Sequence, residues 1–327
     1  MIQERKKDHV EVALGQDFAQ FTDQRFYYEP MLSAHPDHKT LETSFLNYTL
    51  GAPLLISSMT GGWSDGKRIN QILARAAASF RLPMGLGSVG CLLKDESFYP
   101  DFQLRSLLDN APLLANLGIA QVEQYLEVSK SGKIIEMIKR LECDALIIHI
   151  NPLQEWVQKE GDRLKQSPLE TVKKFRELHP QLPLVIKEVG QGFGPKSLMA
   201  LNELDLTAID LAGAGGTNFT EIEAIRKNEE NCLSLVGHNC QQMLSWINQM
   251  KGFKTPLILS GGIQTAIDAH YLISLSHRTS TMVGMAKVFL QWAMKGQQHL
   301  EQQLENWLSQ LQAARCYLKL VTEKRSE

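Results

Sequence analysis

The segment from His149 to Glu155 carries an imidazole, two amides and a carboxylate within seven residues, His-Ile-Asn-Pro-Leu-Gln-Glu. It follows an apolar run, Ala145 to Ile148, that is typical of a buried strand. Because alternate side chains of a strand share a face, His149 and Asn151 are expected to project together. Such a group at a strand end favours a site for a polar ligand and a metal ion. Taken alone, the segment fits a hydrogen-bonded polar cluster at a strand-to-helix turn equally well.

Two glycine-rich loops indicate where a phosphate could bind. Their sequences are Gly213-Ala214-Gly215-Gly216-Thr217 and Ser260-Gly261-Gly262-Ile263, and each follows an apolar run and precedes a helical pattern. Backbone amides can approach a phosphate where side chains are absent, and a helix N-terminus adds its dipole. Glycines also make ordinary tight turns, so one loop would mean little. Two loops in consecutive late units favour phosphate binding.

Lys187 stands at the end of an otherwise apolar run, Leu184 to Ile186. An ammonium group in that position needs an anionic partner. An ion pair with Glu188 or Asp210 is one explanation. The other is the electron-rich edge of a flavin, because a cation there stabilises the negative charge of the reduced ring. Together with the phosphate loops, Lys187 indicates a protein that binds a flavin or a sugar phosphate.

Short apolar runs that alternate with amphipathic helical stretches must position these residues. Eight strands are predicted, at Leu54-Met59, Pro83-Leu86, Leu113-Asn116, Ala145-Ile150, Leu184-Val189, Thr207-Leu211, Leu257-Ser260 and Thr281-Val283. Helices are predicted between them, including Asn70-Phe80, Ile134-Leu141, Leu169-Leu178, Cys240-Met250 and Ala266-Leu275. This count and spacing favour an α/β fold, the (β/α)8 TIM barrel. A doubly wound open sheet is the alternative, although no G-x-G-x-x-G fingerprint follows the first strand.

The 327 residues are expected to form a single barrel domain, with residues 1–50 as an N-terminal extension that lies across one end and covers the barrel mouth. A net charge of -2 gives no electrostatic reason for binding nucleic acid or a membrane surface. The five cysteines lack metal-site spacing and are too few for a disulfide scaffold. The charged N-terminus is followed by no long apolar stretch. A cytoplasmic protein with reduced thiols is therefore expected.

Several motifs resemble those of type 2 isopentenyl diphosphate isomerases, which are FMN-dependent TIM-barrel enzymes. The His149-x-Asn151-x-x-Gln154-Glu155 run and the N-terminal Arg5-Lys6 pair with His9 are the most specific of them. Those shared more widely are Ser58-Met59-Thr60-Gly61-Gly62, Asn116-Leu117-Gly118, Glu160-Gly161-Asp162, Lys187-Glu188-Val189-Gly190, Gly215-Gly216-Thr217 and Ser260-Gly261-Gly262. The resemblance spans nearly the whole chain.

The resemblance implies a reversible double-bond shift between isopentenyl and dimethylallyl diphosphate, a small-molecule substrate pair. In this family reduced FMN handles the protons, NAD(P)H only reduces the flavin, and Mg2+ offsets the charge of the diphosphate. A homo-oligomer of four or eight chains is also implied. The alkene is unactivated, and protonating it creates tertiary carbocation character, so an acid and a base must be held tightly against the carbon skeleton.

The same resemblance implies a role for each matching residue. Gln154, His149 and Asn151 would be catalytic, and Glu155 would bind Mg2+. The substrate would be bound by Arg5, Lys6, His9, Ser88, Asn151 and Gln154, with His149 completing the polar ring around the diphosphate. FMN would be contacted by Ser58, Met59, Thr60, Ser88, Asn116, Lys187, Thr217, Gly261, Gly262 and Ala286. On position alone, Arg5 and Lys6 would be an ordinary solvated chain end.

The chain departs from the family pattern at three positions. Gly90 stands where an arginine usually follows Ser88, which removes a cationic phosphate contact unless Lys94 replaces it. Such a loss weakens binding by about 1.5 to 3 kcal/mol. Gln264 replaces an arginine and Phe219 a tryptophan. These changes leave open a relative with an altered substrate, or a non-catalytic flavin-binding barrel.

An FMN-dependent oxidoreductase of the hydroxy acid oxidase or dihydroorotate dehydrogenase type is the main alternative. Hydroxy acid oxidases place a histidine and arginines against the substrate carboxylate near strands six and seven. Neither residue type occurs in 212–218 or 260–265. A dihydroorotate-type enzyme needs a cysteine or serine base on a loop, and Cys91 fits better as a small buried residue. The residues therefore favour the isomerase.

Overall fold

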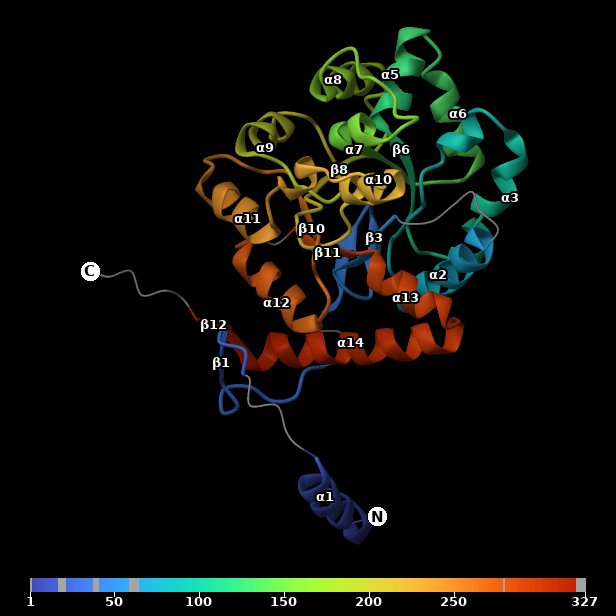
Figure 1. Ribbon diagram of the computed structural model, residues 1–327. Coiled ribbons are helices and arrows are strands. Elements are labelled where there is room, and N and C mark those ends of the chain that lie inside the picture. Colours follow the sequence, from blue (N-terminus) through green and yellow to red (C-terminus); the bar gives the residue numbers. More distant parts are fainter. Residues whose placement is uncertain (1, 17–21, 38–40, 59–64, 279, 322–327) are drawn as a thin grey trace.

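The computed structural model describes residues 2–16, 22–37, 41–58, 65–278 and 280–321 (Figure 1). Its strands are β1 Phe26–Tyr28, β2 Thr43–Phe45, β3 Tyr48–Leu50, β4 Leu54–Ile56, β5 Met84–Gly85, β6 Leu113–Gly118, β7 Ala145–Ile150, β8 Leu184–Glu188, β9 Ala208–Asp210, β10 Leu257–Ser260, β11 Thr281–Met285 and β12 Leu318–Leu320. Short 3-10 turns occur at η2 Gly90–Leu93, η3 Glu96–Phe98 and η4 Cys232–Leu235.

The helices lie between the strands and at both chain ends. They are α1 Ile2–Gly15, α2 Gly66–Phe80, α3 Tyr99–Phe102, α4 Arg105–Leu108, α5 Ile119–Glu127, α6 Gly132–Arg140, α7 Pro152–Val157, α8 Pro168–Leu178, α9 Pro195–Asn202, α10 Phe219–Lys227, α11 Cys240–Gln249, α12 Ala266–Leu275, α13 Lys287–Met294 and α14 Gln297–Tyr317. In the described part of the chain, no helix is both long enough and apolar enough to cross a membrane.

Parallel strands close a barrel in the order β10-β11-β4-β5-β6-β7-β8-β9, which accounts for eight strands among the described residues. Each predicted apolar run overlaps one of them, with β6 and β11 each extending two residues beyond the predicted end, and Figure 1 shows the helices around the central strands. The predicted TIM barrel is therefore confirmed. The runs are apolar because parallel strands are covered by helices on one face and fill the barrel with the other.

Alternation along the strands divides the barrel interior into two levels. The side chains that fill its lower part are apolar and form one buried cluster, which includes Leu55, Leu114, Ile147, Val185, Ala208 and Ile258. Two residues further along each strand the next side chain faces the same way. At that upper level the residues are polar: Ser57, Asn116, His149, Lys187, Asp210 and Ser260. The sequence thus builds a packed core with a polar ring at its C-terminal end.

The β2–β3 hairpin closes the opposite, N-terminal end of the barrel. Leu50 belongs to the interior cluster, and Phe45 packs against it. The Tyr48 hydroxyl donates to Asp144 Oδ1 over 2.7 Å, immediately before β7. Residues 43–50 of the expected extension therefore lie at the end away from the mouth. Helix α1 stands apart from the barrel in Figure 1, so coverage of the mouth by the extension stays a prediction.

The C-terminal part packs around the barrel. Helix α14 runs below the barrel in Figure 1 and packs against α12 and α13. Its end leads into β12, which pairs antiparallel with β1 through Phe26 and Leu320. This small sheet brings residues 26–28 and 318–320 together beside the barrel.

Candidate active site

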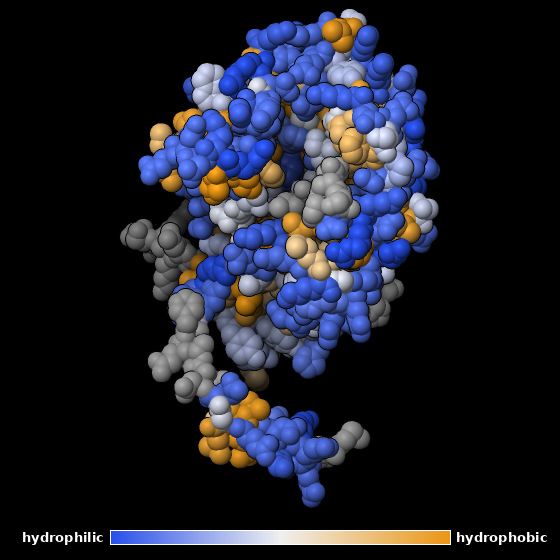
Figure 2. Space-filling model, turned by 45° about the vertical axis from the view of Figure 1, so that its right-hand side comes forward, coloured by the Kyte–Doolittle hydropathy of each residue, from blue (hydrophilic) through white to orange (hydrophobic). Residues whose placement is uncertain are grey.

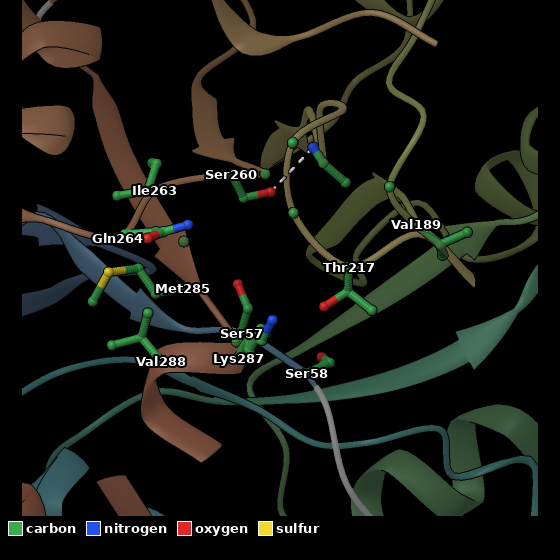
Figure 3. A pocket seen from close by; sticks show the side chains of 18 of the residues that line it. Ser57, Ser58, Val189, Thr217, Ser260, Ile263, Gln264, Met285, Lys287 and Val288 are labelled. Atoms are coloured by element: carbon green, nitrogen blue, oxygen red, sulfur yellow. Dashed lines mark hydrogen bonds between the residues drawn. The ribbon is translucent and has the colours of Figure 1, made fainter. Parts of the chain in front are cut away.

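A cavity of about 470 Å³ opens at the C-terminal ends of β4 and β8 to β11 (Figure 3). Its size lies within the range of small-molecule sites. Ser57 and Ser58 reach it from β4, Thr217 from the loop after β9, and Gln264 from the loop after β10. Figure 3 shows Thr217 across the cavity from Ile263 and Gln264. The cavity therefore occupies the end of the barrel where TIM-barrel enzymes hold their active sites.

The two glycine loops meet backbone to backbone on one side of this cavity. Gly261 has a φ of +97°, and a Cβ there would lie 1.9 Å from the carbonyl oxygen of Gly213. A Cβ on Gly216 would lie 2.9 Å from the amide nitrogen of Gly262. Only glycine permits this approach, which leaves main-chain groups lining the space. The two predicted glycine loops are thus packed against each other at the cavity, and phosphate binding by them stays a prediction.

Helix α13 completes that side of the cavity. Ala286 was named in the sequence analysis, but the helix that follows it was not predicted there. Ala286 precedes its first turn, and Lys287 and Val288 line the cavity (Figure 3). The free N–H groups and dipole of a helix N-terminus attract an anion, and Lys287 adds a full positive charge. The sequence contains a signal for this helix, because the apolar run that ends at Met285 leads directly into a helical pattern. Such a strand and helix form the eighth unit of a barrel, which is a usual position for a phosphate.

Lys187 lines the same cavity from the end of β8. Its Nζ donates to the carbonyl oxygen of Glu188 over 2.7 Å. Glu188 faces away from the barrel interior, where its Oε2 accepts the N–H groups of Gly190, Gln191 and Gly192 over 2.5 to 2.8 Å. Burial raises the pKa of Glu188 even so. Glu188 therefore shapes the loop after β8, and the ammonium of Lys187 stays directed at the cavity.

His149 is a neutral imidazole in the polar ring. Its Nδ1 lies 2.9 Å from Asn116 Oδ1. Because a carbonyl oxygen can only accept, Nδ1 carries the proton and Nε2 presents a lone pair. Burial, and then the charge of Lys187, lower the pKa of His149 to about 4. At neutral pH this side chain is therefore an acceptor and carries no charge.

Asn151, Gln154 and Glu155 come together at the start of α7, as predicted. Asn151 Nδ2 donates to Gln154 Oε1 over 3.1 Å and to Glu155 Oε1 over 2.9 Å. The amide of Asp162 donates to Glu155 Oε2 over 2.8 Å. Asn151 and Glu155 are 2% and 7% exposed. The described residues hold no group of three or more His, Cys, Asp or Glu side chains able to bind a metal, so a cation here would need further oxygen atoms besides those of Glu155.

Four buried oxygen atoms around this end of the barrel accept or donate no hydrogen bond within the described part of the chain. They are Ser57 Oγ, Ser58 Oγ, Asn151 Oδ1 and Asp210 Oδ2. Buried polar atoms without partners cost free energy, and they concentrate where a ligand supplies the missing bonds. Their position around the polar ring fits a ligand with several donors and acceptors.

The structure brings most of the expected cofactor residues to one place. Ser58, Lys187, Thr217, Gly261, Gly262 and Ala286 line the cavity. Asn116 lies on β6, two strands away from both β4 and β8 in the barrel, and bonds His149. Ser88 is exposed after β5 and does not line the cavity. Met59 and Thr60 lie outside the described residues.

Arg5, Lys6 and His9 are not brought to the cavity. They lie on α1, whose side chains from residue 3 onward are exposed. Figure 2 shows this helix projecting from the body of the molecule, with apolar side chains gathered on part of its surface. Val10 and Leu14, one turn apart, are 58% and 85% exposed. A role for these three residues in substrate binding stays a proposal.

The residues that depart from the family pattern lie close to the site. Gln264 and Phe219 both line the cavity. Gly90 begins the turn η2, and a Cβ there would meet Leu117, Ser88 and Gln121 only at ordinary contact distances of 3.6 to 3.7 Å. Lys94 follows that turn and is exposed. A Cβ at Gly90 therefore fits without a clash.

Solved structures with the same fold include two groups of enzymes. A mandelate oxidase mutant with (S)-mandelic acid matches with a TM-score of 0.59 and 14% identity, covering 92% of this chain and 88% of that chain. A flavocytochrome b2 mutant with sulfite bound matches with a TM-score of 0.62 and 15% identity, covering 93% and 78%. At such identity the likeness shows the fold alone. No protein-family model matches the chain.

Sequence similarity identifies a different group of enzymes. The isopentenyl-diphosphate delta-isomerase of Pseudescherichia vulneris is 37% identical over 300 residues, covering 88% of this chain and 84% of that protein. The protein of the same name from Synechococcus sp. is 35% identical over 326 residues, covering 95% and 91%. That from Rickettsia felis is 31% identical over 323 residues, covering 94% and 90%. With this identity over nearly its whole length, the chain belongs to the isopentenyl-diphosphate delta-isomerase family.

Proposed function

We propose that this protein interconverts isopentenyl and dimethylallyl diphosphate as a type 2 enzyme, with FMN bound in the cavity and Mg2+ beside Glu155. One observation carries the flavin part of the proposal. Lys187 and two glycine loops line a single cavity at the C-terminal end of the barrel. The family isomerisation itself rests on relatives that are 31 to 37% identical.

The residues present fit FMN. Gly215, Gly216, Gly261 and Gly262, with the start of α13, would hold the phosphate through main-chain N–H groups and the charge of Lys287. Ser57 and Ser58 bring unpaired hydroxyl groups that would bond polar atoms of the ring system. The ammonium of Lys187 favours negative charge nearby. When bound in its reduced form, which NAD(P)H would generate, FMN supplies the group that exchanges protons with the substrate.

The substrate residues form a second group beside the cavity. Glu155 would hold Mg2+, and the free Oδ1 of Asn151 supports a ligand or cation there. Asn151 and Gln154 would orient the diphosphate, together with Ser88 and with Arg5, Lys6 and His9 from the N-terminal segment. Arginine and lysine suit a diphosphate because of their charge and their donors.

The reaction adds a proton to the terminal methylene carbon and removes one from the carbon two bonds away. No electrons are gained or lost overall. His149, held neutral by burial, would accept a hydrogen bond through Nε2 and keep Asn116 oriented. Gln154 can donate and accept without carrying charge. These uncharged groups would position the substrate without capturing the proton in transit.

An oxidoreductase function is supported less well. The mandelate oxidase and flavocytochrome b2 structures share the fold at 14 to 15% identity. The loops at 212–218 and 260–265 contain no histidine or arginine to bind a substrate carboxylate.

We also propose a homo-oligomer of four or eight chains. The exposed side chains of Tyr28, Met31 and Leu32 support an interface between copies. Analytical sedimentation would measure the number of chains.

The test is to reduce the purified protein anaerobically with dithionite, add Mg2+ and isopentenyl diphosphate in deuterated buffer, and follow the substrate by NMR. We expect a yellow protein and dimethylallyl diphosphate with deuterium in its methyl group. Gln154→Ala, as a matched control, should keep the flavin and lose the conversion. A yellow protein that leaves the substrate unchanged would contradict the isomerase proposal.

A further inference from the structure

Asp210 is a buried carboxylate in the polar ring, which the sequence analysis considered only as an ion-pair partner of Lys187. It ends β9 and is 0% exposed. The Ser260 hydroxyl donates to its Oδ1, and the Ala212 amide approaches the same oxygen at 3.4 Å. Its Oδ2 accepts no hydrogen bond from the described residues. A charge buried with one bare oxygen needs a nearby cation.

Lys187 is that cation. The register of the barrel pairs Lys187 on β8 with Asp210 on β9. Both project into the barrel, because Val185 and Ala208, two residues earlier on each strand, belong to the interior cluster. The charge of Lys187 lowers the pKa of Asp210 and opposes the larger effect of burial, which raises it. The two groups therefore interact although no direct bond joins them.

Asp210 also connects this charge to the phosphate loops. Ser260, which donates to it, is followed directly by Gly261 and Gly262. The Ala212 amide donates to Ser260 Oγ over 3.0 Å, the bond marked by a dashed line in Figure 3, and begins the other glycine loop. One carboxylate thus contacts or faces three strand ends that line the cavity.

We propose that Asp210 is a positioning residue that holds Lys187 in place at the flavin edge, while Ser260 connects it to the glycine loops. The inference rests on the proposed function, since it needs FMN in the cavity. Its consequence is that Asp210 influences the flavin only through Lys187. Asp210 touches no reacting atom in this scheme.

A double-mutant cycle on the FMN-loaded protein tests this. The measured quantity is the midpoint potential of the bound flavin, which reports the ratio of affinities for its reduced and oxidised forms. We expect Asp210→Asn to change that ratio about tenfold in the native background, and less than about twofold in Lys187→Met, where the group it acts through is gone. Asp144→Asn is the control. That carboxylate accepts bonds from Tyr48 and Arg105 at the opposite end of the barrel, so its loss should alter stability but not the potential.

Equal effects of Asp210→Asn in both backgrounds, or no effect in either, would overturn the inference. Should Asp210→Asn fail to fold, Ser260→Ala keeps the carboxylate and removes the bond donated to it, together with the acceptor of the Ala212 amide, and should give a smaller change that also depends on Lys187. Failure of the proposed function looks different. A native protein that takes up no FMN would contradict both proposals. A yellow, active protein in which the effect of Asp210→Asn does not depend on Lys187 would contradict this one alone.

Discussion

At the scale of single residues, burial decides what His149 can do. Partial burial of its ring and the charge of Lys187 on the next strand disfavour the protonated form, so the pKa falls from 6.5 to about 4. Its proton therefore sits on Nδ1, fixed by Asn116, through the whole neutral range. A histidine in this setting orients and accepts, and does not serve as an acid.

This shift makes folding depend on pH. The unfolded chain takes up a proton at His149 near pH 6.5 and the folded chain only near pH 4, so protons favour unfolding between these values. We expect the free energy of unfolding to fall as the pH drops through this window, with His149 contributing no more than about 3 kcal/mol. In His149→Asn that part of the slope should vanish. Denaturant titrations at pH 4.5, 5.5 and 7 on both proteins would show it, and parallel profiles would contradict the prediction. The two lower pH values lie inside the window, and the highest lies about half a unit above it.

Gly90 stands where the family resemblance implies an arginine, and a Cβ there meets its neighbours only at ordinary contact distances. We expect Gly90→Arg to lower the KM for isopentenyl diphosphate about tenfold, because a charge-assisted bond to phosphate contributes about 1.5 to 3 kcal/mol. Gly90→Met adds bulk without charge and should leave KM nearly unchanged. Steady-state kinetics of the three proteins would decide, and an equal effect of both substitutions would show that size alone matters.

At the scale of elements, the two glycine loops work as one unit because their backbones touch. Gly261→Ala would force a Cβ to within 1.9 Å of the Gly213 carbonyl oxygen and would strain a φ of +97°. Gly252 separates the two costs, since its φ is +74° but nothing lies within 4 Å of a Cβ there.

We expect Gly252→Ala to cost about 1 kcal/mol of stability and to leave FMN binding intact. Gly261→Ala should cost about 3 kcal/mol or more and should weaken FMN binding, because the loops must separate to admit the methyl group. Thermal unfolding and flavin titration measure the two effects. Similar behaviour of the two variants would mean that backbone strain, and not loop contact, governs the site.

At the scale of the whole molecule, the packed core and the N-terminal residues proposed to bind the diphosphate lie in different parts of the chain. The barrel and its hairpin plug form the core, whereas the side chains of α1 from residue 3 onward are exposed. Deleting residues 1–15 should therefore leave the melting temperature within about 2 °C of its native value.

The same deletion removes Arg5, Lys6 and His9. If these residues bind the diphosphate as proposed, KM should rise about tenfold or more while the flavin spectrum stays the same. An unchanged KM in the truncated protein would remove the N-terminal segment from the site. A large loss of melting temperature would show that α1 packs on the barrel.

The amino-acid sequence by itself determined the strands, because a strand buried on both faces needs a local run of apolar residues, as at Ala145 to Ile148. It also determined the glycine loops and the cluster of Asn151, Gln154 and Glu155, whose members are near neighbours in the chain. The family motifs predicted that Lys187 and Ala286 lie at the cofactor site, and both line the cavity. The motifs predicted the same for Ser88 and Asn116, which are not part of its lining.

Only the tertiary structure decided what barrel closure brings together. Closure pairs β11 with β4 and so sets the start of α13 and Lys287 beside Ser57, although most of the chain separates them in sequence. It also pairs Lys187 with Asp210 and leaves Asp210 Oδ2 bare among the described residues. Likewise, which end of the barrel the β2–β3 hairpin plugs depends on where Leu50 finds apolar partners. Local patterns fix which face of each strand is buried, but the charge and burial of a side chain depend on neighbours that only the closed barrel supplies.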